Sequence, residues 1–277
     1  MSEAKVPLAG VIGNPISHSR SPLVHGHWLR KYGIAGHYVP IHVEADDLET
    51  VLRSMPKMGF VGANVTIPHK EKIMEIADQV TDRATLIGAA NTLIFRPDGS
   101  ILADNTDGYG FITNLQQSAP DWDPKSGPAV VFGAGGASRA VIASLLEAGV
   151  PEILLSNRTR ERADQFRVEF GSRIQVVEWV QVGNVVEQAK LVVNTTSLGM
   201  VGKPRFRVPL DGLRKDTVVT DLVYTPLKTD MLQWAEEAGC TTVDGLGMLL
   251  HQAVPGFERW FGTRPEVDDA TRAAALA

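Results

Sequence analysis

The segment Asn64-Val-Thr-Ile-Pro-His-Lys70 contains groups suited to proton transfer. Thr66 supplies a hydroxyl and Lys70 an ammonium group, and both follow a run of apolar residues that is closed by a proline. A strand that ends in this way brings a proton donor close to a hydroxyl that can hold a substrate. The same pattern also occurs at ordinary junctions between a strand and a helix, where the lysine is simply solvated.

Two motifs further along the chain support a chemical role. Asn105-Thr-Asp107-Gly-Tyr-Gly110 contains a carboxylate, Asp107, that can either orient a lysine or cap the helix that follows it. Gly133-Ala-Gly135-Gly-Ala-Ser138 comes directly after a run of branched apolar residues and precedes a helical pattern. Together the three motifs predict an enzyme that reduces a carbonyl group with a dinucleotide, because an ammonium group can stabilise and protonate the alkoxide that forms.

The glycine motif has the context of a dinucleotide fingerprint, between a strand and a helix. Glycines let backbone N–H groups approach a pyrophosphate at the positive end of the helix. Ser138 stands where glycine or alanine is usual, and it is also small. A plain tight turn is the alternative interpretation. The predicted cofactor-binding residues of this motif are Gly133, Ala134, Gly135, Gly136 and Ala137.

The next strand ends at Asn157-Arg158-Thr159, with Arg162 shortly after it. An NAD site usually has an aspartate or glutamate at this strand end, to bind the ribose hydroxyls. The sequence has none here and offers amide and guanidinium groups instead, which suit the 2′-phosphate of NADP. The alternative is that Thr159 caps a helix whose arginines are solvated. We therefore predict NADP as the cofactor, bound by these four residues.

The composition is that of an ordinary globular protein, with 44% hydrophobic and 21% charged residues among 277. A net charge of −5 provides no basic field for a nucleic acid, so we expect a small-molecule substrate and no nucleic-acid partner. The first five residues lack a signal-peptide pattern, no apolar run is long enough for a membrane span, and a single cysteine, Cys240, excludes an internal disulfide. These features predict a cytoplasmic protein.

The order of predicted elements indicates two α/β domains. In the N-terminal part, a strand, helix and strand pattern is followed by a hairpin across Pro97-Asp98-Gly99, which predicts a mixed sheet. From Val130 onward, strands and helices alternate, as in a doubly wound parallel sheet. A late helix is expected to start at Thr225-Pro226, as an N-cap and first-turn pair. We predict a substrate domain over residues 1–106, completed by helices in 245–277, and a Rossmann domain over 107–244.

Ser19 and Ser21 come before Pro22, which can occupy the first turn of a helix. Alternate residues of an extended segment point to one side, so both hydroxyls can hold a carboxylate, although Ser21 can also be only a helix cap. With these serines, the motifs at 64–70, 91–92, 105–108, 133–137, 157–159 and 244–249 occur in the order in which they occur in the shikimate dehydrogenase family. The chain resembles that family from about Leu8 to Trp260. Gly26 departs from it, because the family often has asparagine there, and we expect a packing change only.

The resemblance implies reversible, NADPH-dependent reduction of 3-dehydroshikimate to shikimate, in the route to chorismate and the aromatic amino acids. It implies that Lys70 and Asp107 are the catalytic pair, and that Leu222 and Gly245 lie near the nicotinamide. The residues that it places around the substrate are Ser19, Ser21, Thr66, Asn91, Tyr224 and Gln252. No metal is expected, because the seven histidines are not joined by carboxylates or cysteines at ligand spacing.

Two other functions remain open at this stage. One is an NAD-linked quinate/shikimate dehydrogenase, against which Arg158 argues. The other is a catalytically silent NADP-binding sensor on the same fold, against which the presence of both Lys70 and Asp107 argues. The sequence leaves monomer and homodimer equally open.

Overall fold

The computed structural model describes residues 6–277, and the chain forms two compact units. The first unit contains the chain up to Thr106 together with Leu250–Ala277, and the second contains Asp107–Leu249. The expectation that the N-terminus is not a signal peptide concerns residues 1–5, which lie outside the described part. Within residues 6–277, no helix combines the length and the apolar character that a membrane span requires.

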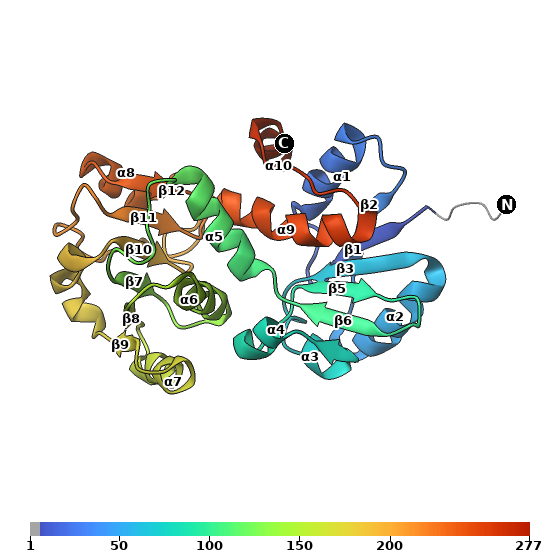
Figure 1. Ribbon diagram of the computed structural model, residues 1–277, viewed down its shortest axis with the longest axis horizontal. Coiled ribbons are helices and arrows are strands. Elements are labelled where there is room, and N and C mark those ends of the chain that lie inside the picture. The colour runs from blue at the N-terminus through green and yellow to red at the C-terminus, as the bar shows by residue number, and fades with distance from the viewer. Residues whose placement is uncertain (1–5) are drawn as a thin grey trace. The chain divides into compact units, whose positions relative to one another are not determined.

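The first unit is built on a mixed sheet of six strands (Figure 1). Its first three strands are mutually parallel, whereas the hairpin predicted across Pro97-Asp98-Gly99 adds two strands in antiparallel order. In spatial order the strands are β2 (His37–His42), β1 (Leu8–Gly13), β3 (Phe60–Val65), β5 (Thr92–Phe95), β6 (Ile101–Asp104) and β4 (Gln79–Val80).

Helices pack on this sheet and on one another. Apolar side chains such as Leu48, Leu52 and Ile73 pack on Ala63 and Leu93 of the sheet. The C-terminal helix α10 lies against α1 (Figure 1), where Trp28 Nε1 donates to Thr271 Oγ1 over 3.1 Å. The helical elements of this unit are α1 (Ser21–Lys31), η1 (Ala45–Asp47), α2 (Leu48–Ser54), η2 (Met55–Met58), α3 (Ile73–Ile76), α4 (Asp82–Ile87) and α10 (Asp269–Leu276).

The second unit is built on a parallel sheet of six strands. All residues of its central strands are buried, as expected for a parallel sheet that is covered on both faces. The predicted fold class, which combines a mixed-sheet unit with a doubly wound parallel unit, is confirmed. In spatial order the strands are β12 (Thr241–Val243), β11 (Val218–Asp221), β10 (Leu191–Asn194), β7 (Ala129–Phe132), β8 (Ile153–Ser156) and β9 (Ile174–Val176).

Alternate residues of β7 face opposite sides of this sheet. Val131 belongs to the core under α5, α6 and α7, whereas Val130 belongs to the core under η3, η4 and α8. Gly108 lets α5 approach α6 closely, because a Cβ there would lie 3.1 Å from the carbonyl oxygen of Ala140. The helical elements are α5 (Asp107–Ser118), α6 (Gly136–Ala148), α7 (Arg160–Phe170), η3 (Trp179–Asn184), η4 (Val186–Gln188) and α8 (Asp230–Glu237).

Helix α9 (Gly245–Phe261) contributes residues to both units. Gly245 packs on the Leu222 backbone of the second unit, because a Cβ at this position would lie 2.3 Å from the Leu222 carbonyl oxygen. Later in the helix, Trp260 Nε1 donates to the Leu93 carbonyl of the first unit over 3.0 Å. The contacts therefore divide the chain inside this helix, at Leu250, rather than at the predicted residue 245.

The predicted start of helix α8 was wrong. The helix begins at Asp230, and its N-cap is Thr229, whose Oγ1 accepts from the backbone N–H of Leu232. Thr225-Pro226 lies in the preceding loop. Both places offer a threonine before a suitable first residue, and the difference is that the Thr229 hydroxyl also donates to the buried Asp221 over 2.8 Å. A tertiary hydrogen bond thus selects one of two local signals.

Candidate active site

Most of the predicted substrate residues of the first unit lie around one edge of its sheet. Ser19 and Ser21 come after the carboxyl end of β1, and Thr66 comes directly after the carboxyl end of β3, its parallel neighbour. Asn91 precedes β5, which runs antiparallel to β3 and so begins at the same edge. Carboxyl ends of parallel strands are where α/β sheets carry their ligands.

The two serines stand at the start of helix α1. Ser21 is the first helical residue, and the N-cap is Arg20, which makes no side-chain cap hydrogen bond. Ser19 Oγ accepts from the backbone N–H of Ser21 over 3.3 Å. Both serines are half-buried. The Ser21 side chain therefore does not cap helix α1.

Lys70 lies in a turn between β3 and α3. The turn is held on both sides of the lysine. The ring Nε2 of the buried His69 contacts the Val43 carbonyl at 2.8 Å, and the Lys70 carbonyl accepts from Ala90 N–H over 2.9 Å. Helix α3 begins at Ile73, and the Ile73 N–H donates to the His69 carbonyl over 3.0 Å, so Lys70 lies in the turn that leads into this helix. The lysine is half-buried there.

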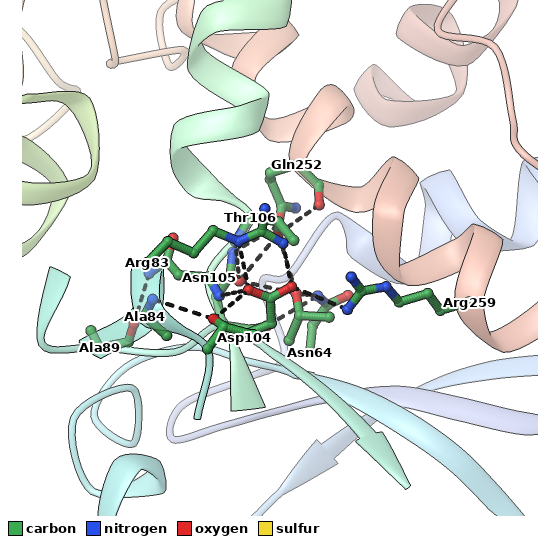
Figure 2. A network of polar contacts seen from close by, with 12 residues as sticks. Asn64, Arg83, Ala84, Ala89, Asp104, Asn105, Thr106, Gln252 and Arg259 are labelled. Carbon is green, nitrogen blue, oxygen red and sulfur yellow. Dashed lines mark hydrogen bonds and ion pairs between the residues drawn. The ribbon is translucent and has the colours of Figure 1, made fainter. Parts of the chain in front are cut away.

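A polar network connects Asn91 with Thr106 and Gln252. Figure 2 shows Thr106 and Gln252 within it. Asn91 Oδ1 accepts from the Thr106 backbone N–H over 2.9 Å, and Asn91 Nδ2 donates to Gln252 Oε1 over 3.2 Å. Thr106 Oγ1 also donates to the Gln252 carbonyl over 2.8 Å. Two predicted substrate residues, 161 positions apart in the sequence, are thus in direct contact. Their side chains are held in place before any ligand binds.

Asn64 extends this network toward strand β2. It accepts from the Tyr38 hydroxyl over 2.7 Å and donates to the Asn91 carbonyl over 3.1 Å. Asn64 is 5% exposed, and a buried amide needs such partners because an unsatisfied one is costly. The first residue of the opening motif therefore supports Asn91 rather than facing a ligand.

Asp104, the last residue of β6, joins three elements of the first unit (Figure 2). Its buried carboxylate pairs with Arg83 of α4 through both oxygens, and Arg259 Nη1 of α9 contacts Oδ2 at 3.1 Å. Asp104 Oδ1 also accepts from Thr81 Oγ1 and from the Asn105 N–H, both over 2.8 Å. Burial opposes ionisation, but these donors together hold the pKa of Asp104 below its usual range. The segment that leads to Thr106 and Asp107 is therefore firmly anchored.

Two of the predicted catalytic and substrate residues, Asp107 and Tyr224, belong to the second unit. Asp107 is the first residue of helix α5, where a negative charge is favourable. Tyr224 is half-buried in the loop after β11. Their catalytic and substrate roles remain predictions.

The glycine motif of the second unit forms a turn between β7 and α6. Gly133 has φ +106°, and a Cβ there would lie 2.6 Å from Thr195 Oγ1, so only glycine fits. At Gly135 and Gly136, by contrast, a Cβ would meet no atom within 4 Å. The open space at these two glycines lies at the helix N-terminus, where N–H groups without intrahelical partners can bind a pyrophosphate. The turn therefore fits the dinucleotide.

Two side chains hold this turn in place. Ser138 Oγ accepts from Gly135 N–H over 2.6 Å and donates to the Gly135 carbonyl over 2.9 Å. Asn157 Oδ1, at the end of β8, accepts from Ala134 N–H over 3.1 Å, and its Nδ2 donates to the Thr159 carbonyl over 2.7 Å. Asn157 therefore links the glycine turn to the arginine-containing turn that follows β8.

Arg158 lines a cavity of about 370 Å³ beside the end of β8. Asn157 also lines it, together with Trp179 and the loop after β10. Thr159 and Arg162, which were predicted beside them, are not among the residues that line this cavity. Sequence reasoning missed two further lining arginines, Arg205 and Arg207. Their alternation with buried Phe206 and Val208 was a signal that could have identified them.

The residues predicted near the nicotinamide lie together within the second unit. Gly245 approaches the Leu222 backbone closely enough to exclude any side chain. Leu222 follows Asp221, whose buried carboxylate accepts from Asn194 Nδ2 over 2.9 Å, Val223 N–H over 3.0 Å and Thr229 Oγ1 over 2.8 Å. Burial outweighs these bonds and raises the pKa of Asp221 to about 6. Among residues 6–277, no three metal-ligating side chains form a group.

Comparisons with known proteins agree with these features. Residues 11–93 match the family described as "Shikimate dehydrogenase substrate binding domain", residues 115–201 match "Shikimate / quinate 5-dehydrogenase", and residues 245–275 match "Shikimate 5'-dehydrogenase C-terminal domain". The chain is 73% identical to the shikimate dehydrogenase (NADP(+)) of Ruegeria sp. (strain TM1040), over 100% of both chains.

Two solved structures illustrate the structural similarity. The shikimate 5-dehydrogenase of Thermus thermophilus, in complex with NADP(H) and shikimate, has a TM-score of 0.86 and 34% identity, with 98% of this chain and 99% of that chain covered. The quinate dehydrogenase of Corynebacterium glutamicum, in complex with NAD, has a TM-score of 0.90 and 31% identity with the same coverage. By its family matches, its sequence identity and the geometry of its site, this chain belongs to the shikimate dehydrogenase family.

Proposed function

We propose that the chain catalyses the reversible, NADPH-dependent reduction of 3-dehydroshikimate to shikimate, a step toward chorismate and the aromatic amino acids. The observation that carries this proposal is the network of Asn91, Thr106 and Gln252 at the edge of the first sheet, in a chain that is 73% identical to a shikimate dehydrogenase (NADP(+)). A rigid polar surface of this kind suits a substrate with several hydroxyl groups and a carboxylate.

The substrate is bound by the hydroxyl and amide groups of the predicted set. The hydroxyls of Ser19 and Ser21 bind its carboxylate, and Thr66, Asn91 and Gln252 bind its ring hydroxyls. Tyr224 contributes a further phenolic hydroxyl. For Asn91 and Gln252 the support is direct contact with each other, since such preorganised groups lose little conformational entropy when the substrate binds.

The chemistry at the substrate needs one proton and one hydride. NADPH supplies the hydride when it is bound. Lys70 donates the proton to the oxygen that becomes the hydroxyl, and its ammonium charge stabilises the negative charge on that oxygen. Asp107 orients Lys70 for this proton transfer.

NADP is bound by the second unit. The open space at Gly135 and Gly136 receives the pyrophosphate, with Gly133, Ala134 and Ala137 completing the turn. Asn157, Arg158, Thr159 and Arg162 recognise the adenosine end, and Leu222 and Gly245 lie beside the nicotinamide. The cationic cavity at Arg158 argues for NADP over NAD, and so does the cofactor named for the Ruegeria relative. We therefore favour this activity over an NAD-linked quinate dehydrogenase and over a silent sensor.

The decisive test removes the proton donor. Lys70→Ala should lower kcat by about 10² to 10⁴, the usual contribution of general acid catalysis, while the Kd for shikimate changes much less. Asp107→Ala should lower kcat strongly too, and the double variant should be little worse than the poorer single variant. The matched control is Lys72→Ala, two positions along in the same turn, where the lysine is exposed and pairs with Glu75.

The measurements are absorbance of NADPH during turnover and calorimetry with shikimate. Near-normal kcat in folded Lys70→Ala protein would refute the mechanism. Failure of the wild-type protein to oxidise shikimate with NADP would refute the activity itself. We also propose that the enzyme works in the cytoplasm, which its single cysteine suits, as a monomer or a homodimer.

A further inference from the structure

The segment between β10 and β11 presents two arginines beside the predicted cofactor site. Arg205 and Arg207 are exposed and line the same cavity as Arg158, although they lie about fifty residues later in the sequence. The buried residues between and after them, Phe206 and Val208, are 0% and 3% exposed. Because alternate residues of an extended segment face opposite sides, burial of these two fixes the side on which the arginines lie.

The segment is anchored to the body of the second unit. The ring of Phe206 packs edge-on against Phe132, the last residue of β7, with centroids 5.0 Å apart. Trp179, which also lines the cavity, packs edge-on against the same Phe132 at 5.7 Å. Within the loop, Gly199 N–H donates to the Pro204 carbonyl over 2.8 Å. Trp179 and the segment that carries the two arginines are therefore both held against the buried ring of Phe132.

The positive charge of the residues that line this cavity favours the binding of an anion. Three of its lining residues are arginines, and none is an aspartate or glutamate. The nearest compensation is outside the lining, where Arg205 Nε lies 3.6 Å from Asp230 Oδ2. Three guanidinium groups in one cavity repel one another, and a phosphate monoester, with a charge of about −1.5 to −2 at neutral pH, relieves that repulsion. NAD has no such group at its adenosine ribose.

We propose that Arg205 and Arg207 bind the 2′-phosphate of NADP together with Arg158, and so are further determinants of cofactor specificity. The inference rests on the proposed function, because it presupposes that NADP binds to the second unit. It goes beyond the strand-end motif, since it assigns part of the phosphate recognition to a segment that no dinucleotide fingerprint contains.

The test uses 2′,5′-ADP as the probe and 5′-AMP as the probe that lacks the 2′-phosphate, with Kd values measured by calorimetry on the full chain. Arg205→Gln and Arg207→Gln should each raise the Kd for 2′,5′-ADP about 3- to 10-fold, and the double variant should raise it by more than about tenfold. The Kd for 5′-AMP should change less than about twofold, because that probe lacks the phosphate that the arginines bind. The slope of log Kd against log salt for 2′,5′-ADP should also become shallower, because fewer charges are neutralised.

The matched control is Lys203→Gln, which removes an exposed positive charge from the same segment but from a residue that does not line the cavity. It should leave both Kd values unchanged. The inference is overturned if the double variant binds 2′,5′-ADP as the control does, or if it loses both probes equally. If the wild-type protein itself does not prefer 2′,5′-ADP to 5′-AMP, the NADP assignment fails. If Arg158→Gln loses that preference while the double variant of Arg205 and Arg207 keeps it, only the role of Arg205 and Arg207 is overturned.

Discussion

Each unit buries one aspartate as the last residue of a strand, and the two are stabilised in opposite ways. Asp104 ends β6 and contacts Arg83 and Arg259, and although burial opposes ionisation, hydrogen bonds from Arg83 and Thr81 hold its pKa below its usual value. Asp221 ends β11 and accepts only from neutral groups, and burial raises its pKa to about 6. Both side chains are 0% exposed. At Asp221 burial outweighs the neutral hydrogen bonds, whereas at Asp104 the guanidinium of Arg83 and the neutral donors together outweigh burial.

The difference also has consequences for function. The ion pairs of Asp104 connect α4, β6 and α9 (Figure 2), and α9 carries Gln252, one of the proposed substrate residues. The neutral donors of Asp221 instead shape a loop, the one that contains Leu222 and Tyr224. We expect the ion pairs of Asp104 to hold the substrate-binding helix α9 in place. We expect Asp221 to make the stability of the second unit depend on pH.

The largest expected effect on stability comes from removing the charge of Asp104. Asp104→Asn should lower the free energy of unfolding by about 3 to 5 kcal/mol, because removal of one partner from a buried ion pair is strongly destabilising. Urea denaturation measures this value. The control is Asp78→Asn, since Asp78 pairs with Arg53 at 2.7 Å but is 38% exposed, and such a pair contributes about 0 to 1 kcal/mol. Equal losses in the two variants would contradict the comparison.

A somewhat smaller effect is expected from Asp221, and it depends on pH. The folded-state pKa of about 6 is above the ordinary value of 3.8, so the folded protein binds more protons than the unfolded chain between these pH values. Stability from this group is therefore complete below about pH 4 and is lost as pH rises through about 6. The loss should be about 3 kcal/mol, since one pKa unit corresponds to about 1.4 kcal/mol.

The variant Asp221→Asn isolates the pH-dependent contribution of Asp221 to stability. The amide keeps an acceptor for Asn194 and Val223 but carries no titrating proton, so the difference between wild-type and variant stability should vary with pH only between about 4 and 6. Urea denaturation at several pH values measures it. A difference that stays constant across this range would show that Asp221 is ionised throughout, like Asp104.

The smallest expected effect concerns Arg259, and it tests whether the contact of Arg259 with Asp104 helps to position Gln252 for the substrate. Arg259→Gln leaves Asp104 paired with Arg83, so stability should fall by only about 1 kcal/mol. Because Arg259 lies on the same helix as Gln252, the KM for shikimate should rise a few-fold while kcat and the KM for NADP stay close to wild type. The control is Arg264→Gln, whose arginine pairs with the exposed Glu258. An effect on kcat alone would exclude the positioning role.

The sequence by itself determined the fold class and the strand ends that carry the predicted site residues. Branched apolar runs such as Val130-Val131-Phe132 and the glycine turn after them are local signals, and local signals fix where a strand ends. The motif at Gly133–Ser138 was also readable in the sequence, because the φ of Gly133 and the hydroxyl of Ser138 act within one turn. Strand β4 and helices α3 and α4 were missed, because they are too short to show a period.

Only the tertiary structure decided which distant side chains meet. Asp104 and Arg259 are 155 residues apart, and no spacing rule connects an aspartate at a strand end with an arginine on the last long helix. The same holds for Asn91 with Gln252 and for the N-cap of α8, where Thr229 is preferred to Thr225 because its hydroxyl reaches Asp221. Periodicity and turn chemistry act over a few residues, whereas ion pairs and hydrogen bonds of this kind depend on how strands are ordered in a sheet.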